Sequence, residues 1–148
     1  MKTLALLTTL LVAATVSVLA HGVKVEIGPK GGRLLPAKGV TGAAYVEFFV
    51  AKGGVAEVTL LDKAKKQLPL GETAIGVTVG KRSEAKILSM SAKDNAAVSA
   101  EPMPAKGEYP VVIQVNASRT APPATVRFNY INGSCDGCKK AEYICTCH

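Results

Sequence analysis

The 148-residue chain contains no tryptophan, only three phenylalanines and four tyrosines. Its formal charge of +7 is scattered along the sequence, and no aromatic residues are interleaved with the basic ones. Surfaces that bind nucleic acids usually combine clustered Lys and Arg with aromatic side chains on which bases stack. The composition therefore argues against a protein that binds nucleic acids.

Histidine is also scarce, because His21 and His148 are the only two in the sequence. A Ser/His/Asp or Cys/His catalytic set needs a histidine that the fold can bring to a nucleophile, and these two lie near opposite ends. The carboxylates are spread singly along the chain, as at Glu26, Glu47 and Glu57, and form no acid–base pair. We expect a protein that is not an enzyme.

The first twenty residues have the pattern of an export signal. Lys2 supplies a positive charge, residues 4–19 form an apolar run, and Val18 and Ala20 are small residues at the −3 and −1 positions of a cleavage site. The run is short for a membrane span and turns polar without a stop-transfer pattern. The sequence predicts a signal peptide at residues 1–20, a periplasmic or secreted location, and no stable membrane insertion after cleavage.

The segment from residue 21 to residue 131 alternates apolar and polar side chains with a period of two, separated by short turns rich in Gly, Pro, Asp and Asn. This pattern is typical of antiparallel strands with one solvated face. Strands are expected at residues 23–27, 45–50, 56–61, 75–79, 86–90, 97–101, 111–116 and 125–130. Seven to nine short strands predict an all-β fold, a single antiparallel β-sandwich of immunoglobulin-like or fibronectin-like architecture.

The last fourteen residues hold all four cysteines, spaced C-x2-C-x6-C-x-C: Cys135, Cys138, Cys145 and Cys147. Two intervening residues allow a tight turn whose sulfurs point to a common centre. One intervening residue places both side chains on the same face of an extended segment. Four thiolates suit zinc, and soft thiolates also suit Cu(I). Residues 132–148 are therefore predicted to be a metal-binding tail for zinc or copper.

Other uses of these residues remain open. An exported protein meets an oxidising compartment, where four cysteines can form two disulfides in three possible connectivities. Cys135 and Cys138 could act as a redox pair, although they lack the strand-to-helix context that lowers a thiol pKa in thioredoxin-like folds. His21, if freed by cleavage, could chelate copper through its amino group and imidazole, with His148 as the second histidine.

The runs IGPKGGRLLPAKG, YVEFFV, VTLLDKAKKQLPL and VRFNY give the chain a resemblance to a known group. They resemble small bacterial exported β-sandwich proteins similar to domains associated with heavy-metal efflux adaptors. The resemblance implies a periplasmic role near metal handling, with an envelope or efflux protein as partner. Such domains often carry histidines near the Gly-Gly motif, whereas this chain has only His21 there, so the metal role falls on the four cysteines. The alternative function is an envelope interaction module fastened by disulfides without metal.

Overall fold

The computed structural model describes residues 24–118, 120 and 122–147. This part of the chain holds ten strands and one short 3-10 helix, η1, and no α-helix. The elements are β1 (Glu26–Ile27), β2 (Arg33–Pro36), β3 (Tyr45–Val50), β4 (Val55–Leu61), β5 (Ala74–Val79), β6 (Lys86–Leu88), β7 (Met90–Lys93), β8 (Ala96–Pro102), β9 (Glu108–Asn116), β10 (Ala124–Ile131) and η1 (Glu142–Ile144).

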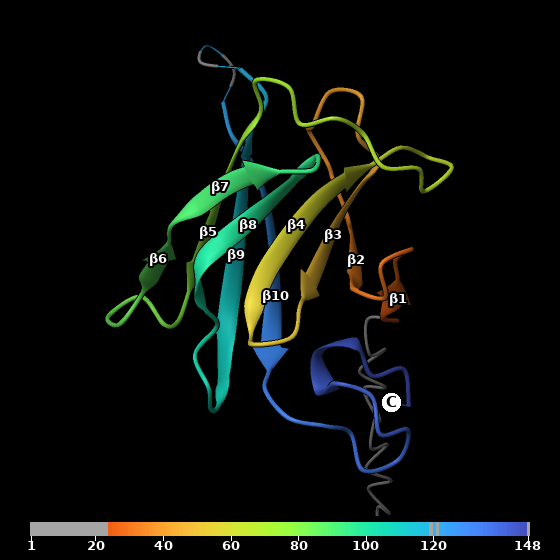
Figure 1. Cartoon of the computed structure of the whole chain (residues 1–148), viewed down its shortest axis with the longest axis vertical. Coiled ribbons are helices and arrows are strands. Elements are labelled where there is room, and N and C mark those ends of the chain that lie inside the picture. The colour runs from red at the N-terminus through yellow and green to blue at the C-terminus, as the bar shows by residue number, and fades with distance from the viewer. Residues whose placement is uncertain (1–23, 119, 121, 148) are drawn as a thin grey trace, which may run out of the picture.

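The strands form two antiparallel sheets that pack face to face (Figure 1). The larger sheet has the order β1-β2-β3-β4-β8-β7, and the smaller has the order β10-β9-β5-β6. This architecture confirms the predicted all-β sandwich, and the alternation of side chains explains it. Every second residue of a strand points inward, so the apolar members of each run meet between the sheets.

The core between the sheets contains Val46 and Phe48 from β3, Val77 from β5, Ile113 from β9 and Phe128 from β10. Four of these five side chains are completely buried, and Phe128 nearly so. Burying one such side chain stabilises a fold by about 1.5–3 kcal/mol. Phe48 also lies edge-on to Phe128, with ring centroids 5.1 Å apart, which joins the two sheets near the end of the sandwich where the tail packs.

Three short strands, β2, β6 and β7, differ from the sequence expectation. Residues 86–90 were expected to form one strand, but β6 belongs to the smaller sheet and β7 to the larger, with Ser89 between them. Alternation cannot tell which sheet a strand joins, and Ile87 points outward with 74% of its surface exposed. The alternating pattern does not predict strand β2, because its residues Leu34 and Leu35 are consecutive and both buried.

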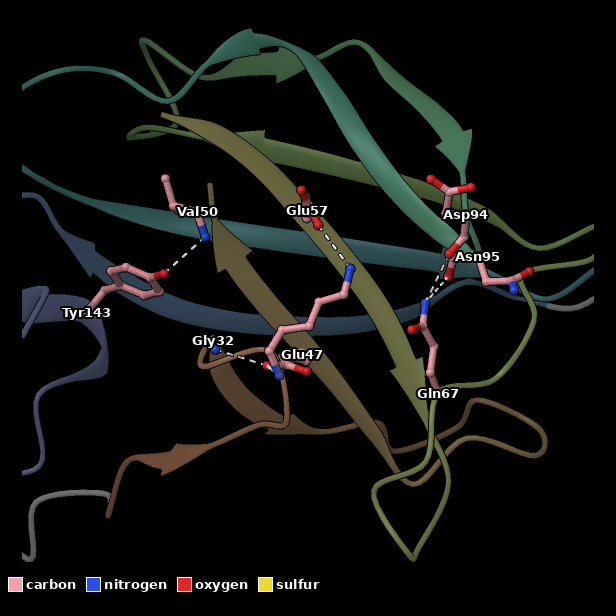
Figure 2. Close-up of polar contacts among 9 residues, drawn as sticks. Gly32, Glu47, Val50, Glu57, Gln67, Asp94, Asn95 and Tyr143 are labelled. Carbon is pink, nitrogen blue, oxygen red and sulfur yellow. Dashed lines mark hydrogen bonds and ion pairs between the residues drawn. The ribbon is translucent and has the colours of Figure 1, made fainter. Parts of the chain in front are cut away.

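The glycine-rich turn between β1 and β2 is held by a buried carboxylate. Glu47 is fully buried, and its Oε1 accepts hydrogen bonds from the backbone N–H groups of Lys30 and Gly32, both at 2.9 Å; Figure 2 shows the second. A Cβ on Gly28 would lie 2.3 Å from the Glu47 Cδ, so this close approach requires glycine. The turn fixes where β2 begins, and with it the position of Arg33.

The structure bears on membrane insertion only for the residues it describes. Among these, no helix has the length and apolar character needed to cross a membrane. The expected signal peptide at residues 1–20 and the two histidines, His21 and His148, lie outside the described residues.

Candidate metal centre

The segment that follows β10 folds back against one end of the sandwich (Figure 1). Its first residue, Asn132, donates its backbone N–H to the Gly107 carbonyl at 3.2 Å and its side-chain amide to the Ala105 carbonyl. Ser134 and Ala141 then face each other as an isolated antiparallel bridge. These contacts close the tail into a compact loop rather than an extended arm.

Tyr143, which lies between the two cysteine pairs, fastens this loop to the sandwich. Its side chain is buried and stacks on Tyr130 of β10, with ring centroids 5.0 Å apart. It also meets Phe48 edge-on at 6.1 Å. The Tyr143 hydroxyl accepts a hydrogen bond from the backbone N–H of Val50 at 3.0 Å, as Figure 2 shows. One side chain thus links the tail to strands of both sheets, and burial raises the pKa of its hydroxyl.

Arg33 makes a second link to the tail. Its Nη1 donates a hydrogen bond to the backbone carbonyl of Tyr143 at 3.2 Å. The guanidinium also lies over the ring of Phe128, 5.2 Å from the centroid, as a cation–π contact. Arg33 is the first residue of β2 and directly follows the glycine-rich turn. Its side chain therefore connects this turn with Phe128 in the core and Tyr143 in the tail.

The first cysteine pair sits in a tight turn. The backbone N–H of Lys139 donates to the Cys135 carbonyl at 2.9 Å, and the N–H of Cys135 donates to the Lys140 carbonyl at 2.8 Å. Lys139 takes the left-handed backbone conformation, with φ of 57°, which costs a non-glycine residue about 1–2 kcal/mol. The turn places Cys135 and Cys138 on the same side of the loop.

All four sulfurs meet at one point. The Sγ atoms of Cys135, Cys138, Cys145 and Cys147 all lie within 4.8 Å of one another. The Sγ of Cys145 lies 3.0 Å from that of Cys135 and 3.7 Å from that of Cys138. A tetrahedral zinc site with Zn–S bonds of about 2.3 Å has sulfur–sulfur edges of about 3.8 Å. No pair is at the ~2.05 Å distance of a disulfide, and all four cysteines are free thiols.

The protonation of the four thiols is uneven. A hydrogen bond from the backbone of Lys140, supported by one with Cys147, lowers the pKa of Cys138 to about 7. Cys145 donates a hydrogen bond to the Cys135 sulfur, and this raises the pKa of Cys145 to about 12. The hydrogen bond with Cys138 likewise raises the pKa of Cys147. A metal ion entering at neutral pH therefore meets one readily ionised sulfur and displaces protons from the others.

The charges around the cluster are mixed and exposed. Lys139 and Lys140 follow Cys138 directly, and Lys139 Nζ forms an ion pair with Asp136 at 3.7 Å. Such exposed ion pairs contribute little to stability. Their position nevertheless matters for a metal site, because a divalent ion held by four thiolates carries a net charge of about −2 that adjacent ammonium groups offset.

The structure thus brings together all four cysteines that the sequence singled out as metal ligands. Sequence reasoning missed Tyr143 and Arg33, which hold the tail in place. A signal for Tyr143 is present, since a lone aromatic residue between two cysteine pairs has no partner within the tail itself. Arg33 gives no such signal, because its partner Tyr143 lies 110 residues away along the chain.

Comparison of the chain with protein-family models, with curated proteins and with solved structures gives no match in any of the three. Function must therefore be argued from the site itself.

Proposed function

We propose that the chain is a non-enzymatic metal-binding protein whose C-terminal cysteines hold one zinc or Cu(I) ion. The observation that carries the proposal is the convergence of four free sulfurs within 4.8 Å. Four free thiols rarely lie this close together unless they bind a ligand, because an exposed free thiol is open to oxidation.

Zinc is the better fit to four sulfurs. In structural sites zinc is typically bound by four ligands in tetrahedral geometry, and four thiolates are one such set. Cu(I) needs only two or three of them, so it would leave part of the set unused. Binding of either ion would hold the loop between Ser134 and Cys147 closed, adding to the docking by Tyr143.

The place of action is the periplasm or the extracellular space, and the process is heavy-metal handling. Two features of the sequence support this part of the proposal: the export signal at residues 1–20 and the resemblance to domains associated with heavy-metal efflux adaptors. An envelope or efflux protein is the corresponding partner.

The second candidate is an envelope interaction module whose tail is fastened by two disulfides. One distance favours it: the sulfurs of Cys135 and Cys145, at 3.0 Å, are closer than tetrahedral coordination needs. Bond formation between them would leave Cys138 and Cys147 as the second pair, because these also lie within 4.8 Å of each other.

Titration of the reduced full chain with Co²⁺ and then Zn²⁺ tests the proposal. Metal binding predicts visible absorption typical of cobalt in tetrahedral thiolate coordination, saturating at one ion per chain, and its loss when zinc is added. The Cys135→Ser variant should lose this signal. The matched control is Ser134→Ala, which changes the neighbouring exposed residue and should bind normally. A fully reduced chain that takes up neither Co²⁺ nor Zn²⁺, and no Cu(I) in a parallel titration, refutes the metal function.

A further inference from the structure

The four cysteines of the tail differ in their access to solvent. Cys135 and Cys145 are buried, with 5% and 2% of their surfaces exposed. Cys138 is half-buried and Cys147 is exposed. Each cysteine pair of the sequence therefore contributes one inner and one outer sulfur, so that the cluster has a buried half and an accessible half.

Gly137 keeps the outer half uncovered. A Cβ placed on this residue would lie 3.6 Å from the Sγ of Cys147 and 3.8 Å from that of Cys135. These are ordinary van der Waals distances, and the Gly137 backbone is outside the left-handed region, so a side chain is sterically allowed there. Glycine is therefore not required by the turn. Its effect is to leave the approach to the sulfurs open.

In a structural zinc site the protein ligands fill all four coordination positions. A bound ion can then leave only when an incoming ligand displaces one of them, and the outer sulfurs of Cys138 and Cys147 are accessible to such a ligand. This cluster combines four ligands with one open side. We infer that the bound ion is exchangeable, and that it passes to or from a thiol-bearing ligand by attack at the Cys138–Cys147 side. The inference rests on the proposed function, since it supposes that the cluster binds an ion.

The exchange is a substitution of ligands without a redox step. An incoming thiol loses its proton and its sulfur bonds to the ion as the bond to Cys147 breaks. The released Cys147 thiolate takes up a proton, so charge and atoms balance. A second thiolate replaces Cys138 in the same way. The ion then leaves Cys135 and Cys145 as two further thiol sulfurs of the excess dithiol bond to it, and the protons that these thiols lose pass to the Cys135 and Cys145 thiolates. The loop stays docked on the sandwich during the exchange, because Tyr143, rather than the metal, holds it there.

The test uses the zinc-loaded full chain and excess dimercaptosuccinate, a small dithiol. Samples taken at intervals are read by native mass spectrometry for loss of the zinc adduct. Attack by the dithiol predicts a transfer rate that rises in proportion to the dithiol concentration. The Gly137→Leu variant, whose side chain covers the Cys147 sulfur, should bind zinc with the same stoichiometry and release it roughly tenfold more slowly. Gly137→Ala should fall between the two.

The control is Ser134→Leu, which places the same side chain at an exposed, uncharged residue of the loop three positions earlier. It should transfer zinc at the rate of the unmodified chain. A release rate independent of dithiol concentration, or equal rates for the chain and both Gly137 variants, overturns the inference and leaves the proposed metal function standing. Failure of the chain to bind either zinc or Cu(I) overturns both.

Discussion

Removal of the Tyr143 side chain should detach the tail and weaken metal binding. The ring is buried, stacks on Tyr130 at 5.0 Å and meets Phe48 at 6.1 Å, and its hydroxyl accepts the Val50 N–H at 3.0 Å. Truncating a buried aromatic ring to alanine costs about 3–5 kcal/mol. Because only the hydroxyl is lost in Tyr143→Phe, that variant leaves one partly buried N–H without an acceptor, at about 1 kcal/mol.

Tyr143→Ala should have a larger effect than Tyr143→Phe on both the free energy of unfolding and the affinity for zinc. Docking of the tail and binding of metal favour each other reciprocally, so the docking energy lost sets an upper limit on the metal affinity lost. Tyr143→Phe should then weaken zinc binding by up to about fivefold, and Tyr143→Ala by a larger factor. Urea unfolding of the metal-free chain gives the stability change, and zinc competition with a chromophoric chelator gives the affinity.

Tyr45→Ala is the matched control, because Tyr45 lies on the same strand as Phe48 but at the opposite end from Val50. It should lower the free energy of unfolding without changing zinc affinity. If Tyr143→Ala keeps both the urea midpoint and the zinc affinity of the unmodified chain, the docking described for the tail is refuted.

Three further results are expected. Glu47→Ala should lower the free energy of unfolding by at least about 2 kcal/mol in urea titrations, since it leaves two backbone N–H donors unpaired; stability equal to that of the unmodified chain would show that Glu47 does not hold the turn. Lys139→Gly should relieve the left-handed strain at φ of 57° and raise the metal-free stability by up to about 1 kcal/mol, and a drop would contradict the strain argument. At pH 7 iodoacetamide should alkylate Cys138 of the metal-free chain before Cys145, as read from peptide masses, because the pKa of Cys138 is lowered to about 7 and that of Cys145 is raised. Alkylation of Cys145 before Cys138 would refute these pKa shifts. Because the pKa of Cys138 is lowered on folding, its thiolate stabilises the folded chain at pH values above its ordinary pKa of 9, and this stabilisation is lost as the pH falls through about 7.

The sandwich could be predicted from the sequence because its long strands alternate cleanly. In β9 and β10 every second residue is buried, as at Val111, Ile113 and Phe128, and the period survives in the sequence without knowledge of partners. The short strands could not be assigned, because two to four residues do not establish a period, and Leu34 and Leu35 break it.

The convergence of the four cysteines could be predicted because their spacing alone limits where their sulfurs can point. The docking of the tail could not, because it depends on contacts between distant parts of the chain. Arg33 meets Tyr143 only after the glycine-rich turn has been fixed on Glu47, and no local pattern around Arg33 encodes that. The different exposure of the four sulfurs has the same origin, since it follows from how the loop rests on the sandwich.

Native mass spectrometry of the chain purified without added metal from its proposed periplasmic or extracellular location tests the central claim most directly. The account predicts an intact chain with four reduced cysteines that carries one zinc or copper ion, lost on acidification as the thiolates are protonated. A metal-free chain lighter by the hydrogens lost in forming two disulfides would contradict it and would leave the disulfide-fastened interaction module.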